Sequence, residues 1–199
     1  MIRIGILALQ GAFIEHRQLL KRLNIETFEI RQLSDLSGQI DGIILPGGES
    51  TVMGRLLKDL NLFDPIEKLL LADLPVYGTC AGAILLAKQI SNDSHTWFQT
   101  MNITVRRNAY GRQLGSFKIV SPFKDHGNVP MVFIRAPRIE DFGSSVTILS
   151  SHEGYATSAR EKNMLVTTFH PEVTEDLTIH RYFVEMCQLH QNQKENPIC

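Results

Sequence analysis

The chain has 199 residues, enough for one domain that buries a full hydrophobic core. Hydrophobic residues make up 43% of the sequence and charged residues 21%, which is typical of water-soluble globular domains. The formal net charge of -1 provides no overall attraction to nucleic acid or to an anionic membrane, and no apolar stretch reaches the length of a membrane span. We therefore expect a protein that binds neither nucleic acid nor membrane.

The cysteines Cys80, Cys187 and Cys199 form an odd and sparse set without metal-ligand spacing. Such usage favours a reducing compartment, so we expect a cytoplasmic protein without a metal or a cofactor. The N-terminal residues lack the small-residue cleavage site of a secretion signal and are interpreted as a first strand.

The first half of the chain alternates between strand-like and helix-like patterns. We predict strands at residues 2–9, 26–30, 41–45 and 74–77, and helices at residues 13–23, 50–60, 65–71 and 83–88. This alternation predicts right-handed crossovers and a parallel sheet with helices on both faces.

The second half contains short strand candidates joined by turn-rich links, at residues 103–105, 117–120, 132–134, 146–149 and 165–169. Few helices separate them, which predicts an antiparallel extension of the sheet. A final helix at residues 177–191 places Cys187 on its apolar side, and residues 192–199 form a polar tail that we expect to be frayed. The predicted fold is one three-layer α/β domain over residues 1–199.

The most informative motif is Gly78-Thr79-Cys80-Ala81-Gly82, between a predicted strand and a predicted helix. Small residues around one cysteine at such a junction are typical of a nucleophile elbow with sulfur in place of the serine oxygen. The glycines permit the tight turn, and the helix start favours the reactive thiolate. The alternative is a buried structural cysteine.

A glycine turn, Leu45-Pro46-Gly47-Gly48-Glu49-Ser50-Thr51, ends another predicted strand and begins a helix. Its backbone N–H groups are candidates for binding an oxyanion or an anionic substrate group. The turn lacks the lysine and the spacing of a nucleotide-binding P-loop, and glycine turns before helices also serve geometry alone.

The third motif is Thr168-Phe169-His170-Pro171-Glu172. Pro171 favours an extended conformation at His170, and in an extended segment residues two apart face the same side. Glu172 would then hold the imidazole of His170, as in a nucleophile-base-orienter triad, whereas the alternative is a surface loop with an unrelated histidine. The other histidines are expected on helix surfaces or in loops, without a metal cluster: His16, His95, His126, His152, His180 and His190.

In this order and context, Cys80, His170 and Glu172 resemble the triad of class I glutamine amidotransferases. The chain is most similar to one branch of that family, the glutaminase subunits of pyridoxal 5'-phosphate synthases. Blocks that carry this similarity span nearly the whole sequence: residues 6–12 with Glu15 and His16, 45–51, 78–82, Arg107-Asn108, Gly111-Arg112-Gln113, 133–137 and 169–176. The segments 97–101 and 163–166 depart from the family pattern, which leaves the shape of those loops open.

The resemblance implies that Cys80 attacks the carboxamide of glutamine to form a thioester, while His170 transfers protons and Glu172 orients it. It implies an oxyanion hole made by the backbone N–H groups of Gly48 and Ala81. It further implies a glutamine site formed by Gly48, Glu49, Ser50, Arg107, Ile134 and Arg135.

The resemblance also implies a partner, a barrel-shaped synthase subunit that receives the ammonia for vitamin B6 biosynthesis within a large hetero-oligomeric complex. Two alternatives stay open. The same fold serves other amidohydrolases, such as the glutaminase of imidazole glycerol phosphate synthase or a γ-glutamyl hydrolase, although Gly111-Arg112-Gln113 and residues 133–137 argue against them. A catalytically inactive scaffold is the other alternative, and the presence of all three triad residues argues against it.

Overall fold

The computed structural model describes residues 1–110 and 115–195. The first half alternates between strands and helices as predicted, in the order β1 (Arg3–Leu7), α1 (Phe13–Arg22), β2 (Glu26–Ile30), the 3-10 helix η1 (Leu33–Leu36), β3 (Gly42–Leu45), α2 (Ser50–Asp59), α3 (Phe63–Leu71), β4 (Val76–Thr79) and α4 (Ala81–Leu86). The second half consists mostly of strands, namely β5 (Ala87–Ile90), β6 (Met101–Arg106), β7 (Ser116–Phe123), β8 (Gly127–Ile134), β9 (Arg138–Phe142), β10 (Thr147–His152), β11 (Tyr155–Glu161) and β12 (Met164–Thr167), followed by the 3-10 helix η2 (Pro171–Val173) and α5 (Thr178–Glu195).

A ten-stranded sheet runs through the middle of the described structure in the order β2-β1-β3-β4-β12-β11-β9-β6-β5, with β10 paired to β11. The strands from β2 to β12 are parallel to their neighbours, and β11 and β9 add an antiparallel extension. Strand order reverses at β1, which has β2 on one side and β3 on the other. Open α/β sheets bind ligands beside such a reversal, at the carboxyl ends of the strands.

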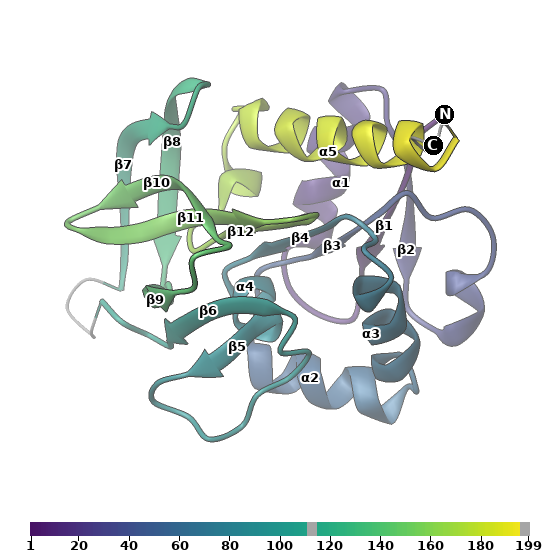
Figure 1. The fold of residues 1–199 in the computed structure, drawn as a ribbon, viewed down its shortest axis with the longest axis horizontal. Helices are drawn as coiled ribbons and strands as arrows, with labels where there is room; N and C mark the ends of the chain where they lie inside the picture. The colour runs from purple at the N-terminus through teal and green to yellow at the C-terminus, as the bar shows by residue number, and fades with distance from the viewer. Residues whose placement is uncertain (111–114, 196–199) are drawn as a thin grey trace.

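Helices cover both faces of the sheet, α1 and α5 on one and α2 and α3 on the other (Figure 1). Each face has its own buried cluster. Leu57 and Ile66 belong to the cluster under α2 and α3, and Tyr77 and Phe183 belong to the cluster under α1 and α5. The β7–β8 hairpin joins the second cluster through residues such as Phe133. These layers confirm the predicted three-layer α/β class.

Strands β5, β9 and β11 were not predicted, and the predicted helix at 83–88 was wrong at its end. This helix stops at Leu86, and residues 87–90 pair with β6 in parallel instead. Cys187 lies fully buried on α5, as predicted, and burial raises the pKa of its thiol. Helix α5 continues to Glu195, beyond its predicted end, while Cys199 and Gly111-Arg112-Gln113 lie outside the described residues.

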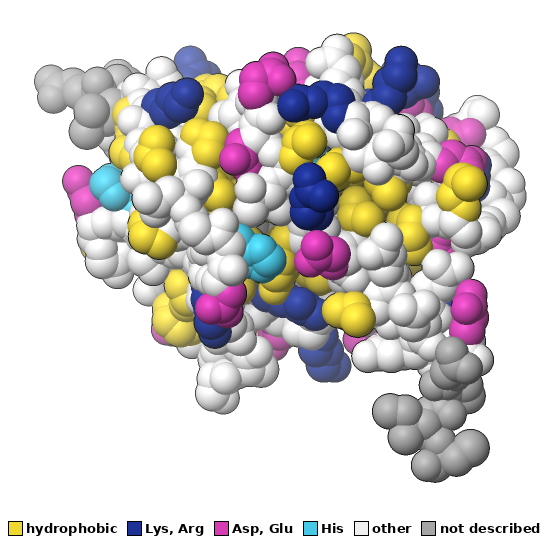
Figure 2. Space-filling model, turned by 90° about the horizontal axis from the view of Figure 1, so that it is seen from above, with side chains coloured by type: hydrophobic (Ala, Val, Ile, Leu, Met, Phe, Trp, Pro, Cys, Tyr) yellow, Lys and Arg dark blue, Asp and Glu magenta, His cyan; other side chains and the backbone are white. Residues whose placement is uncertain are grey.

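Acidic and basic side chains are interspersed with hydrophobic ones over the face drawn in Figure 2, in keeping with the net charge of -1. Within residues 1–110 and 115–195, none of the helices combines the length and the apolar character needed to cross a bilayer.

Candidate active site

Cys80 lies on a sharp turn between β4 and α4 with backbone angles of φ 47° and ψ -95°. A non-glycine residue adopts this region only when its surroundings enforce it, at a cost of about 1–3 kcal/mol. The neighbours do enforce it, because a Cβ on Gly78 would come within 2.6 Å of the carbonyl carbon of Gly82, and one on Gly82 within 2.0 Å of the Leu45 oxygen. The turn therefore has the strained geometry of a nucleophile elbow.

Four adjacent parallel strands bring the candidate groups together, because each group follows the carboxyl end of a strand. Gln10 follows β1, Gly48 follows β3, Cys80 follows β4 and His170 follows β12. The backbone N–H of Cys80 donates to the Thr167 oxygen at 2.8 Å, which ties the elbow to the end of β12. Groups that are distant in sequence thus meet at one edge of the sheet.

Glu172 holds His170 from the short helix η2. The Nδ1 atom of His170 lies 2.7 Å from Oε1 of Glu172, and the two side chains are 9% and 0% exposed. The predicted extended segment was wrong, however: Pro171 begins a 3-10 turn that is closed by a hydrogen bond from the Thr174 N–H to the Pro171 oxygen at 3.1 Å. The turn, and not strand alternation, sets the contact between the two side chains.

The surroundings of His170 favour its charged form. Burial lowers its pKa, but hydrogen bonds with Cys80 and Glu172 and the negative charges of both groups outweigh burial and raise the pKa to about 10. An imidazolium held in contact with the thiol group is the partner that a nucleophilic thiolate needs.

The glycine turn after β3 packs against the turn after β1. The Ala12 N–H donates to the Gly47 oxygen at 3.0 Å, and the Glu49 N–H donates to Oε1 of Gln10 at 2.8 Å. The Glu49 carboxylate caps α2 by accepting from the N–H groups of Thr51 and Val52. Burial raises the pKa of Glu49, but these hydrogen bonds lower it by more than burial raises it, so the pKa of Glu49 lies below its usual value. Those two N–H groups are therefore occupied by the chain itself, so the N–H of Thr51 is not among the candidates in this turn for binding an anion.

A cavity of about 370 Å³ opens above Cys80. Its volume suits a free amino acid. Most of the predicted site residues line it: Gly48, Glu49, Ser50, Cys80, Arg107, Ile134, Arg135 and His170. Ala81 and Glu172 are buried and are not among its lining residues. The sequence did not predict Gln10, Ile84 and Asn108, which line it as well. The place of Gln10 in the site could have been predicted, because it stands at the end of a strand beside the reversal in strand order, where open α/β sheets bind ligands.

Arg107 lies at the edge of this cavity between two carboxylates. Its Nη2 is 3.0 Å from Oε1 of Glu49, and its Nη1 is 2.7 Å from Oδ2 of Asp93. The guanidinium is thereby fixed in position beside the cavity, where it can meet a carboxylate of a ligand.

Two histidines contradict their predicted surface positions. His16 and His180 are both 0% exposed, and Nδ1 of His16 lies 2.9 Å from Nε2 of His180 beneath the site. The burial of His16 could have been predicted from helix spacing, because His16 precedes Leu19 and Leu20 by three and four residues and therefore shares their buried helix face.

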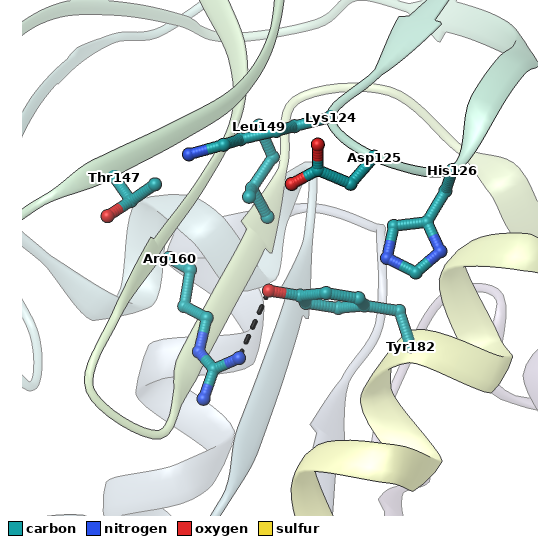
Figure 3. Close-up of a pocket in the computed structure, with 7 residues that line it drawn as sticks. All are labelled: Lys124, Asp125, His126, Thr147, Leu149, Arg160 and Tyr182. Carbon is teal, nitrogen blue, oxygen red and sulfur yellow. Dashed lines mark hydrogen bonds between the residues drawn. The ribbon is translucent and has the colours of Figure 1, made fainter.

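A second cavity, of about 270 Å³, lies between the β7–β8 turn, strands β10 and β11, and α5 (Figure 3). The guanidinium of Arg160 donates to the Tyr182 hydroxyl at 3.1 Å across it. The residues that line it include no thiol and none of the triad: Lys124, Asp125, His126, Thr147, Leu149, Arg160 and Tyr182. Size alone therefore does not distinguish the candidate active site; its chemistry does.

The chain is similar to known proteins over nearly its whole length. The pyridoxal 5'-phosphate synthase subunit PdxT of Methanocorpusculum labreanum is 57% identical over 93% of this chain and 97% of that protein, and the subunit of the same name from Streptococcus pneumoniae is 52% identical over 94% and 98%. A crystal structure of a glutamine amidotransferase, 40% identical, superimposes with a TM-score of 0.88 over 93% of this chain and 98% of that chain. A glutamine amidotransferase from Thermotoga maritima, 18% identical with a TM-score of 0.60 over 98% and 86%, shares the fold alone. Residues 6–189 match the SNO glutamine amidotransferase family, and the chain belongs to that family.

Proposed function

We propose that this chain hydrolyses L-glutamine to L-glutamate and ammonia as the glutaminase subunit of a pyridoxal 5'-phosphate synthase. One observation carries the proposal: a cysteine on a strained elbow and a histidine that is held by a buried carboxylate line the same cavity, which is of amino-acid size. Relatives that are 50–57% identical and carry the name of that subunit support it.

In the proposed reaction, the proton of the Cys80 thiol passes to His170, and the thiolate sulfur attacks the carboxamide carbon of glutamine to form a C–S bond. The N–H groups of Gly48 and Ala81 stabilise the oxyanion of the tetrahedral intermediate. His170 gives its proton to the departing ammonia as the C–N bond breaks, which leaves a thioester. His170 then takes a proton from water, whose oxygen attacks the thioester and releases glutamate and the thiolate. Glu172 holds His170 in one orientation throughout.

We assign glutamine binding to the residues that line the cavity around this centre, namely Gly48, Glu49, Ser50, Arg107, Ile134 and Arg135. The carboxylate of Glu49 suits the α-amino group of the substrate, and Arg107 suits its α-carboxylate.

Replacing Arg107 by Met should raise the KM for glutamine roughly 10- to 100-fold with a small change in kcat, because a charge-assisted hydrogen bond contributes about 1.5–3 kcal/mol. Steady-state kinetics measures the effect. Arg106→Met is the matched control, since Arg106 points outward to Glu140 at 3.8 Å and should leave KM unchanged. Equal KM values for the two variants would remove Arg107 from the substrate site.

The ammonia-consuming partner is, in this proposal, a barrel-shaped synthase subunit in a large hetero-oligomeric complex. We also place the protein in the cytoplasm, which the free thiols of Cys80 and Cys187 support. The test of the function is ammonia release from glutamine, measured with and without the synthase subunit. Release should be slow alone and rise at least tenfold with the partner, because partner docking completes the oxyanion site at Gly48. A rate of ammonia release that does not change when the synthase subunit is added, or a preference for γ-glutamyl peptides, would favour the alternative amidohydrolases.

A further inference from the structure

The buried oxygen of Glu172 that faces away from His170 has an unusual environment. Oε1 accepts from His170, but Oε2 has no hydrogen-bond partner among the described residues. The polar atom that approaches it is Nε2 of His16, at 3.7 Å, and both side chains are 0% exposed. A buried carboxylate oxygen without a partner is costly, so this contact calls for a physical explanation.

His16 connects three parts of the site. Its Nε2 is 3.1 Å from the hydroxyl of Thr79, the residue before the nucleophile, and it also faces Glu172. Its Nδ1 is 2.9 Å from Nε2 of His180 on α5. The start of its own helix contacts the glycine turn, through the hydrogen bond from Ala12 to Gly47.

The positions of the protons along the series of side chains His180, His16 and Glu172 follow from the pKa shifts of the two histidines and from the groups at either end of the series. Burial, followed by the proximity of the titratable rings of His180 and His170, lowers the pKa of His16, and burial lowers that of His180 to about 3, so the rings of His16 and His180 are neutral and each has one N–H. If the proton of His16 were on Nδ1, a lone pair of Nε2 would face the carboxylate, and Nδ1–H of His180 would be a buried donor without a partner. In the opposite assignment, Nδ1 of His180 is an acceptor without a partner, but no lone pair of His16 faces the carboxylate: His180 Nε2–H donates to His16 Nδ1, and His16 Nε2–H points to Thr79 and Glu172. The contact with Glu172 therefore favours the proton on Nε2 of His16.

We propose that His16 is a positioning residue for the glutaminase reaction, whose Nε2–H closes onto Oε2 of Glu172 and so fixes the carboxylate that orients His170. The contact of 3.7 Å is longer than a hydrogen bond, but such bonds in unliganded sites are commonly long and shorten in the reacting complex. This inference rests on the proposed triad.

The titratable groups around Glu172 are His170 from its own turn, His16 from α1 and the Tyr77 hydroxyl from β4. Strand β8 also packs against this turn but carries no titratable side chain. Burial, followed by the charge of Glu172, raises the pKa of Tyr77, so Tyr77 stays neutral and does not supply a competing charge. Glu172 raises the pKa of His170 through its hydrogen bond and its charge, so a carboxylate that loses its donor on Oε2 should stabilise the imidazolium of His170 less well.

The test compares His16→Met, which removes the N–H, with His16→Gln, whose amide nitrogen can occupy the position of Nε2. Kinetics are measured in complex with the synthase subunit. His16→Met should lower kcat by about tenfold or more with KM within about twofold, as for other residues that orient a catalytic side chain. The alkaline limb of its pH profile should move to lower pH, because Glu172 then raises the pKa of His170 less, and His16→Gln should restore most of both. Ser150→Ala, which removes a buried hydroxyl bonded to Thr157, is the matched control for general destabilisation.

A wild-type kcat and pH profile in folded His16→Met would overturn the inference, as would an unshifted alkaline limb with a lowered kcat. If His16→Met does not fold, nitrogen-15 spectra of the wild-type imidazoles decide the matter: a proton on Nδ1 of His16 refutes the proposal, and one on Nε2 supports it. His170→Ala separates this failure from failure of the proposed triad, because an active His170→Ala enzyme would exclude the triad itself.

Discussion

Cys80→Ala should abolish ammonia release, lowering kcat by about six orders of magnitude, as removal of a nucleophile does in other triads. Alanine keeps the Cβ that the elbow already accommodates at φ 47°, so the fold should remain intact. Glutamate formation in complex with the synthase subunit measures the effect. Cys187→Ala removes a fully buried thiol on α5 and should retain activity, which makes it the matched control.

Two results would contradict this prediction. Residual hydrolysis by Cys80→Ala near the wild-type rate would mean that another nucleophile acts. A glutamine-like electrophile that labelled Cys80 no faster than Cys187 would support the inactive scaffold, because a thiol beside an imidazolium should react far faster than a buried thiol whose pKa is raised by burial.

The free energy of unfolding should fall by about 5 kcal/mol between pH 6.5 and pH 4.5, because His16 and His180 are buried as neutral rings. Burial lowers the folded-state pKa of His180 to about 3 and that of His16 well below 6.5, whereas both rings take up protons in the unfolded chain. Each ring contributes about 1.4 kcal/mol per pH unit in this window. Stability is therefore present above pH 6.5 and lost as the pH falls. Urea unfolding at successive pH values measures this loss.

His180→Gln should reduce the pH-dependent loss by about half, because one of the two titrating groups is gone from both states. His126→Gln should not change it, since His126 is exposed. His170 acts in the opposite direction: its pKa of about 10 gives stability below pH 6.5 that is lost as the pH rises toward 10, so it does not contribute to the acid slope. An equal slope in wild type and His180→Gln would contradict the neutral pair.

The regular half of the fold could be predicted from the sequence because its strands are apolar and its helices are amphipathic. The missed strands lack that pattern. Strand β11 buries Thr157 and Ser158, which hydrogen bond to Ser150, and β9 has mostly exposed side chains. Sheet pairing stabilises such segments where local propensity does not, so only the tertiary structure shows them.

The candidate triad was predictable because Cys80, His170 and Glu172 each stand in a short motif at the end of a strand or in the turn after it. His16 was not assigned to the site because a histidine is counted as polar, although its helix spacing pointed inward. The capping of α2 by Glu49 could not be predicted from the sequence either, because only the three-dimensional structure shows which acceptor reaches the N–H groups of Thr51 and Val52.

Strand β12 comes late in the chain, yet it lies in the centre of the sheet between β4 and β11. A polypeptide emerging from the ribosome therefore exposes its cysteine long before the imidazole that would activate it has been synthesised. Until β12 is inserted, β4 also lacks a neighbour on that side, so the elbow cannot be held by the Thr167 oxygen. If the proposed triad is correct, we expect nascent chains and N-terminal fragments that lack β12 and His170 not to hydrolyse glutamine.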